Sequence, residues 1–133
     1  MEMRIGFPGG FRIDAKFKGH TVTTDQSVEA GGEGAEPSPF DLFLASIGTC
    51  TGYYILAFCR KREIPTEGLE LRLRAEREGD GKLVTRIRIE VLLPEGFPSR
   101  YAEACLRAAG QCTVKRHLEA PPRIDLALAG ETT

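Results

Sequence analysis

The chain has 133 residues, a formal net charge of -1 and four cysteines. This length suits a single domain over residues 1–133 with its own hydrophobic core. A hydrophobic content of 41% excludes an intrinsically disordered chain, and the balanced charge removes the electrostatic basis for binding nucleic acid. The N-terminus lacks the basic and apolar segments of a secretory signal, so we expect a cytoplasmic protein whose cysteines are reduced.

The N-terminal part of the sequence predicts short β-strands. Residues 3–7 are followed by the turn sequence Pro-Gly-Gly, and residues 11–18 alternate apolar with charged side chains at the period of a strand. A third strand is expected over residues 20–25. Residues 26–37 are rich in Gly and Glu and predict a loop.

A long helix is predicted to begin after this loop and to run to about residue 60. Ser38 can cap it, Pro39 suits its first position, and Asp41 can complete a capping box. The helix is apolar almost all round, but its polar residues and the amphipathic pattern of the remaining chain favour a buried helix and no membrane association. A chain of this length covers such a helix poorly, so we expect a homodimer that shares its core. Close packing would use a face of small residues, formed by Ala45, Gly48, Thr49 and Gly52.

A β-hairpin is predicted after the long helix. Residues 69–76 and 86–93 alternate apolar with charged side chains, and residues 79–81 make the turn between them. Each strand has one apolar and one charged face, so the hairpin should cover a core on one side only.

Short helices and a last strand are predicted to complete the chain. Ser99 is expected to cap a second helix, which Gly110 interrupts, and further helical turns run from Cys112 to residue 119. Alternating apolar residues over 124–128 predict a final strand. The order of strands, helix, hairpin, helices and strand indicates the α+β class.

The spacing of the four cysteines limits which of them can meet. Cys59 follows Cys50 by nine residues, so the two thiols leave opposite faces of the first helix. Cys105 and Cys112 are seven residues apart, about 10 Å along a continuous helix, which is beyond the reach of a disulfide. Any pair therefore joins the first helix to the second helical region, through Cys50 or Cys59 on one side and Cys105 or Cys112 on the other.

Sequence context separates the four thiols. Cys105 lies on the apolar stripe of its helix, which favours a small buried side chain. Cys59 is also expected to be structural, although the basic residues that follow it would favour reactivity instead. Cys112 begins a new helical turn, and a helix N-terminus with basic residues nearby stabilises a thiolate. Cys50 is flanked by glycine and threonine, small residues that would let a substrate approach.

Other chemistries lack their motifs in this sequence. There is no CxxC pair and no GK[ST] segment that would bind phosphate. The two histidines, His20 and His117, have no metal-ligand spacing with the cysteines, so neither a metal nor a cofactor is expected. A Cys-His hydrolase that uses one of these histidines stays open as an alternative, but no spacing supports it.

Two segments of the sequence resemble the cysteine motifs of the OsmC/Ohr family. The first is PSPFDLFLASIGTCTGYY, which ends at Tyr54, and the second is AAGQCTVKRHL, which ends at Leu118. The spacing between the two cysteines and the intervening hairpin match as well, so the resemblance covers essentially the whole chain. It implies an OsmC-like α+β fold, in which antiparallel sheets wrap around two long central helices of an intertwined homodimer with active sites at its interface.

The resemblance also implies a function and the residues that perform it. Family members act in oxidative stress and reduce organic hydroperoxides to alcohols with two cysteines. Cys50 would be the peroxidatic thiolate and Cys112 the resolving thiol, and an external dithiol would reduce their disulfide. An arginine of the family's N-terminal strands would correspond to Arg12 or Arg4.

The match is weaker at the acidic residue that orients the thiolate in the family. Its position holds Phe40, and the adjacent Asp41 either replaces it or only completes the capping box. The absent glutamate motivates an alternative function, in which the fold is a binding module for a small apolar or thiol ligand with weak or no peroxidase activity.

Overall fold

The computed structural model describes residues 1–130 of the chain. It divides into two compact units, Met1–Ser46 and Ile47–Thr133, and we describe each by itself. Helix α1, Pro39–Lys61, begins in the first unit and continues into the second.

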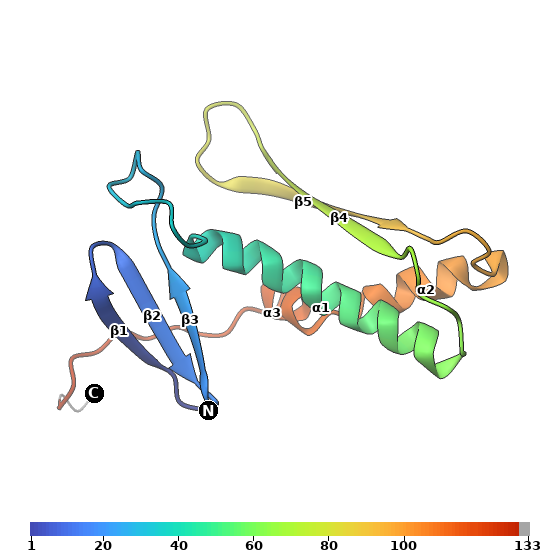
Figure 1. Cartoon of the computed structure of the whole chain (residues 1–133), viewed down its shortest axis with the longest axis horizontal. Coiled ribbons are helices and arrows are strands. Elements are labelled where there is room, and N and C mark those ends of the chain that lie inside the picture. The colour runs from blue at the N-terminus through green and yellow to red at the C-terminus, as the bar shows by residue number, and fades with distance from the viewer. Residues whose placement is uncertain (131–133) are drawn as a thin grey trace. The chain divides into compact units, whose positions relative to one another are not determined.

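The first unit is built on a three-stranded antiparallel sheet in the order β1-β2-β3. Its strands are β1 (Arg4–Gly9), β2 (Arg12–Phe17) and β3 (His20–Thr24), which Figure 1 shows in blue. The β2–β3 turn is tight, because Phe17 pairs with His20 and both residues between them, Lys18 and Gly19, have positive φ angles of 48° and 76°. Positive φ at both positions is the signature of a hairpin turn whose twist matches its strands. The three predicted strands are confirmed.

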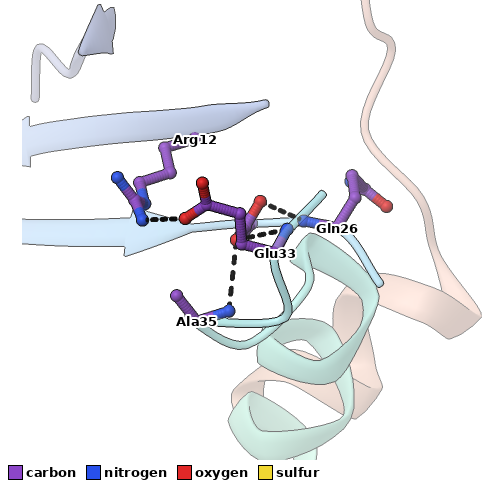
Figure 2. A network of polar contacts seen from close by, with 5 residues as sticks. Arg12, Gln26, Glu33 and Ala35 are labelled. Carbon is purple, nitrogen blue, oxygen red and sulfur yellow. Dashed lines mark hydrogen bonds and ion pairs between the residues drawn. The ribbon is translucent and has the colours of Figure 1, made fainter. Parts of the chain in front are cut away.

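The loop after β3 is organised by one buried carboxylate. Asp25 is only 1% exposed and accepts hydrogen bonds from the backbone N–H groups of Gln26 (2.8 Å), Ala35 (3.1 Å) and Glu33 (3.2 Å). Glu33 is also ion-paired with Arg12 of β2 at 2.5 Å, as Figure 2 shows. The pKa of Asp25 lies below its ordinary value, mainly because of the hydrogen bond from the Gln26 N–H. Burial alone would raise this pKa, but the Ala35 and Glu33 N–H groups and the Arg12 guanidinium lower it further.

Glycine is required where this loop folds back on itself. A Cβ atom at Gly32 would overlap the backbone carbonyl of Gln26 and the carboxylate of Asp25. The glycine-rich composition that predicted only a loop therefore reflects a specific close approach of backbone to backbone.

A reciprocal capping box begins α1, as predicted. The Ser38 N–H donates to the Asp41 carboxylate at 2.9 Å, and the Asp41 N–H donates to the Ser38 hydroxyl at 3.1 Å. The helix ends where Glu63 takes a φ of 54° and the Ile64 N–H donates to the Cys59 carbonyl at 2.9 Å. This pattern satisfies a carbonyl of the last turn and closes the helix before Pro65.

The second unit packs a hairpin and short helices against the C-terminal part of α1. The hairpin consists of β4 (Glu70–Arg77) and β5 (Val84–Leu92), and the helical segments are η1 (Ser99–Tyr101), α2 (Ala102–Ala109) and α3 (Thr113–Glu119). The buried residues of this core are Ile55, Phe58, Cys59, Ile64 and Cys105. Leu71 of β4 and Val91 of β5 pack on it while their charged neighbours face outward, so the predicted one-sided hairpin is confirmed.

Ser99 does not cap the second helix, contrary to the prediction. It begins the 3-10 turn η1, and α2 follows from Ala102 with no side chain capping either segment. Leu106 is also more exposed than its predicted stripe position implies, at 57%. Pro98 holds the N-cap position of η1 with extended backbone, and its ring has no polar atom that could cap the segment.

The predicted final strand is wrong for the isolated chain. Residues 121–128 form no helix or strand, and their apolar side chains are almost fully exposed, at 84% for Ile124, 97% for Leu126 and 72% for Leu128. The alternation is that of a strand, but a strand also needs an edge to pair with, and within residues 1–130 this segment has none.

Helix α1 is long and apolar enough to cross a membrane by length and composition alone, and core helices meet the same criteria. Within the described chain it is only partly covered, since Tyr53 is 63% exposed while Ile55 is fully buried. The predicted face of small residues is divided, because Gly48 lies against Leu73 of β4 while Gly52 faces open space.

Candidate active site

Cys112 is the N-cap residue of α3 and directly precedes its first residue, Thr113. Its Sγ accepts a hydrogen bond from the Lys115 N–H at 3.4 Å, and its carbonyl accepts one from the Arg116 N–H at 3.0 Å. Sulfur here takes the place of the side-chain oxygen that usually caps a helix. The prediction that Cys112 begins a new helical turn after the break at Gly110 is confirmed.

The Cys112 thiol is enclosed by one face of α1. It has no exposed surface, its Sγ donates to the carbonyl of Ile47 at 3.9 Å, and the side chains of Cys50 and Thr51 lie close enough to lower its pKa. These three residues stand at positions i, i+3 and i+4 of α1, which lie on the same face of a helix. Cys50 is half-buried, so the two thiols of this pair differ in their access to solvent.

The pKa of Cys112 lies below its ordinary value. Burial by itself raises this pKa, but hydrogen bonds from the Lys115 N–H, the Cys50 thiol, the Thr51 hydroxyl and the Val114 N–H together outweigh burial. The Thr51 hydroxyl donates to the Ile47 carbonyl at 2.7 Å and has one proton, which can rotate toward the sulfur when the thiol ionises. Cys112 therefore has more thiolate character than a free cysteine.

Cys59 and Cys105 form a second pair of a different kind. Both are buried in the core of the second unit, and their side chains hydrogen-bond each other between α1 and α2. Burial raises the pKa of both thiols, so they stay protonated and unreactive. The structure thus brings together Cys50 with Cys112 and Cys59 with Cys105, two of the four combinations that spacing allowed.

A second polar contact holds α3 to α1 beside the Cys50–Cys112 pair. The Tyr54 hydroxyl lies 2.9 Å from Thr113 Oγ1, so each residue of the contact is close in sequence to one of the two thiols. His117 Nδ1 lies 2.7 Å from the Thr113 carbonyl oxygen. Sequence reasoning missed the Tyr54–Thr113 contact, although the position of both residues within the cysteine motifs could have drawn attention to them.

An apolar cavity of about 300 Å³ opens beside the thiol pair. Ile87, Ile89 and Val91 of β5 form one wall, and Thr51 links the cavity to Cys112 because its hydroxyl hydrogen-bonds that sulfur. Lys115 contributes the one charged side chain of the lining. A cavity of this size and composition suits the apolar body of a small organic molecule.

The predicted orienting residues of the first unit have partners within that unit. Arg12 is ion-paired with Glu33, and Asp41 completes the capping box of α1. Arg4 lies 3.8 Å from Glu2 with 84% of its side chain exposed, against 41% for Arg12. Within the described residues, no group of three His, Cys, Asp or Glu side chains is arranged to hold a metal ion.

These features define an α+β protein with two neighbouring free thiols, Cys50 and Cys112, between α1 and the start of α3. Comparison with known proteins agrees, since the family described as OsmC-like protein matches residues 31–127. That match spans most of the chain, and the chain therefore belongs to the OsmC-like family. Among curated protein sequences none matches this chain significantly.

Solved structures share the fold at low sequence identity. An osmotic stress induced and detoxification response protein from Psychrobacter arcticus is 22% identical, with a TM-score of 0.74 over 86% of this chain and 85% of that one. A hypothetical protein from Aquifex aeolicus is 19% identical, with a TM-score of 0.71 over 90% and 87%. An organic hydroperoxide resistance protein OsmC from Legionella pneumophila is 18% identical, with a TM-score of 0.56 over 89% of both chains.

Proposed function

We propose that this chain is a thiol peroxidase that reduces organic hydroperoxides to alcohols. The observation that carries the proposal is the neighbouring pair of Cys50 and Cys112, of which one is partly buried and the other is a fully buried N-cap with a lowered pKa. The organic hydroperoxide resistance protein that shares the fold supports the choice of substrate class.

The thiol pair can supply both the nucleophile of the reaction and the proton that the leaving alkoxide needs. Transfer of a proton along the hydrogen bond to Cys112 leaves Cys50 as the thiolate, which attacks the peroxide oxygen and breaks the O–O bond. The alkoxide that leaves takes the proton back from Cys112 and departs as the alcohol, while Cys50 becomes a sulfenic acid. The Cys112 thiolate then attacks the Cys50 sulfur and expels hydroxide, which solvent protonates, and an external dithiol reduces the resulting disulfide.

The cavity beside the pair is the proposed site for the organic part of the substrate. Its wall of Ile87, Ile89 and Val91 would bind an apolar group and would gain nothing from hydrogen peroxide, which has none. We therefore expect a higher kcat/KM for cumene hydroperoxide than for hydrogen peroxide.

We further propose that the chain acts as a single-domain homodimer in the cytoplasm. The partly covered helix α1, with Tyr53 exposed, and the exposed apolar side chains of Ile124, Leu126 and Leu128 are the surfaces that a second copy would cover. In such a dimer the two α1 helices form the centre, and the segment over residues 124–128 gains the strand edge that the isolated chain lacks.

Two residues of the first unit complete the proposal. Arg12 is favoured over Arg4 as the guanidinium that orients the thiolate, because its side chain is less exposed and is fixed by Glu33. Asp41 is a positioning residue, since its capping box fixes the first turn of the helix that carries Cys50.

The experiment that tests the proposed function is turnover of cumene hydroperoxide with dithiothreitol as reductant. We expect Cys50→Ser to abolish turnover, and Cys112→Ser, treated with the hydroperoxide in the absence of dithiothreitol, to stop after one turnover at the sulfenic acid. Cys59→Ser and Cys105→Ser are the matched controls, and both should retain most of the activity. Unchanged turnover in Cys50→Ser would exclude the proposal.

A binding module is the second candidate function, and the cavity of about 300 Å³ favours it. In that case the chain would bind a small apolar or thiol ligand and would stay reduced under excess hydroperoxide. Mass spectrometry after treatment with cumene hydroperoxide separates the two functions, because only the peroxidase forms the Cys50–Cys112 disulfide.

A further inference from the structure

We propose that, in the oxidised chain, the external reductant attacks the sulfur of Cys50 and Cys112 is the leaving group, so that the reductant is transiently bound to this chain through Cys50. This inference rests on the proposed two-cysteine mechanism and adds which of the two sulfurs the reductant meets. It follows from two independent asymmetries between the thiols, one of access and one of hydrogen bonding.

The first asymmetry is access. Cys112 has no exposed surface, and the atoms that cover it, from Ile47, Thr51 and Lys115, belong to its own chain. No partner can uncover a sulfur that its own chain encloses. Cys50 is only partly buried by its own chain, so of the two sulfurs it is the one that the chain leaves open to an incoming thiolate. The rate of thiol–disulfide exchange depends on which sulfur is accessible.

The second asymmetry is the set of hydrogen-bond donors around each sulfur. The Lys115 N–H lies 3.4 Å from Cys112 Sγ, the Val114 N–H also lowers the pKa of this thiol, and the Thr51 hydroxyl, which donates to the Ile47 carbonyl, can rotate to the sulfur when it carries charge. None of these three donors depends on the Cys50 proton, so they remain in place when Cys50 is part of a disulfide. They stabilise negative charge on Cys112, and a thiol that is more easily ionised leaves faster.

The exchange balances as two steps. The first thiolate of a dithiol bonds to Cys50 Sγ, the Cys50–Cys112 bond breaks, and its electron pair goes to Cys112, which leaves as the thiolate. The second thiol of the reductant then attacks the reductant's first sulfur, which is bonded to Cys50, and the two reductant sulfurs form an intramolecular disulfide. The electron pair of the broken bond goes to Cys50, which takes up the proton that the second thiol released. The dithiol is oxidised by two electrons and the chain is reduced by two.

The test traps the mixed disulfide. The full chain is oxidised with diamide, which makes the disulfide without any peroxidase activity, and is then treated with the monothiol 2-mercaptoethanol. Acid stops the exchange, the denatured chain is alkylated with N-ethylmaleimide, and fragment-ion mapping locates each group. We expect about tenfold more mercaptoethanol on Cys50 than on Cys112, with the maleimide on Cys112.

A second measurement tests the leaving group. Reduction of the diamide-made disulfide by dithiothreitol should be about threefold to tenfold slower in Thr51→Val, and Thr51→Ser should restore the rate because it restores the hydroxyl. Thr21→Val, the same change at an exposed position of β3, is the matched control and should leave the rate unchanged.

The outcomes separate this inference from the proposed function. A monothiol found mainly on Cys112 overturns the inference and leaves the peroxidase proposal intact. If diamide gives no Cys50–Cys112 disulfide, the inference and the two-cysteine mechanism are both wrong. A monothiol on Cys50 in a chain that does not turn over hydroperoxide supports the inference and overturns the peroxidase proposal.

Discussion

The Tyr54 hydroxyl and Thr113 Oγ1 lie 2.9 Å apart and join the helix of Cys50 to the helix that Cys112 begins. Tyr54 is four residues after Cys50, and Thr113 directly follows Cys112. This contact therefore fixes the distance over which the proposed disulfide must form, because movement of α3 away from α1 would separate the two thiols.

Tyr54→Phe tests this relationship, since it keeps the ring and removes the hydroxyl. We expect a loss of about 0.5–1.5 kcal/mol in the free energy of unfolding, the usual contribution of one hydrogen bond. Disulfide formation after diamide treatment should also slow several-fold, measured by loss of free thiols. Tyr53→Phe is the matched control, because Tyr53 is 63% exposed, and equal effects of the two changes would contradict the prediction.

The two thiol pairs should give the fold opposite dependences on alkaline pH. Burial raises the pKa of Cys59 and Cys105 above the unfolded value of about 8.5, so their contribution is fully present below that pH and is lost as pH rises toward the folded values. The pKa of Cys112 is lowered despite its burial, because the Lys115 N–H and the other donors outweigh it. Its contribution is therefore present above about pH 8.5 and lost as pH falls through the folded value.

Urea unfolding under reducing conditions between pH 6 and 10 measures how the free energy of unfolding changes with pH, and variants of each thiol pair separate the two contributions. Relative to wild type, Cys112→Ser should lose more stability as pH rises from 7 to 9. The double variant Cys59→Ala, Cys105→Ala should instead become more stable relative to wild type as the pH rises above about 8.5. Parallel pH profiles of all three proteins would show that the thiols titrate alike in the folded and unfolded states.

Asp25→Asn should loosen the loop over residues 26–37. The lowered pKa of Asp25 means that its stabilising effect is present above the unfolded pKa of about 4 and is lost as pH falls through the folded value. The difference in Tm between wild type and Asp25→Asn should therefore be largest near neutral pH and shrink below about pH 4. Asp80→Asn, in the exposed hairpin turn, is the control, and an equal effect of both variants would rule out this role for the buried carboxylate.

A charged side chain among the exposed apolar residues of the segment over residues 124–128 should prevent formation of the proposed dimer. We expect Leu126→Asp to shift the mass measured by light scattering after size-exclusion chromatography from two copies to one. Ala127→Asp is the matched control, because neighbouring residues of a strand point to opposite faces. An unchanged mass in Leu126→Asp would remove this segment from the interface.

The local structure could be predicted where a few neighbouring residues determine it. The capping box of Ser38 and Asp41 and the helical turn that begins at Cys112 both depend on contacts within four residues, and the sequence displays such contacts directly. The tight turn at Lys18 and Gly19 follows from the same local chemistry.

The long-range contacts could not be predicted from the sequence pattern. Helical spacing allowed four cysteine pairs, and only the packing of α2 and α3 on α1 selects Cys50 with Cys112 and Cys59 with Cys105. The organising role of Asp25 could not be predicted either. The three N–H groups that donate to its carboxylate come from the loop over residues 26–37, and the sequence does not reveal the path of that loop. The segment over residues 124–128 has the alternation of a strand, but alternation does not supply a neighbouring edge.

Cys112 has two functions that use the same sulfur, since the atom that caps α3 is also the one proposed to enter the disulfide. Oxidation removes the ionisable proton of Cys112, and a disulfide sulfur carries no charge, so the Lys115 N–H has a weaker acceptor there than a thiolate provides. A helix of seven residues has little stability of its own, so it responds when the hydrogen bond of its cap weakens, even though the Lys115 N–H stays beside the sulfur. Hydrogen exchange of the Lys115 amide should therefore report the redox state of the chain, with faster exchange in the disulfide form.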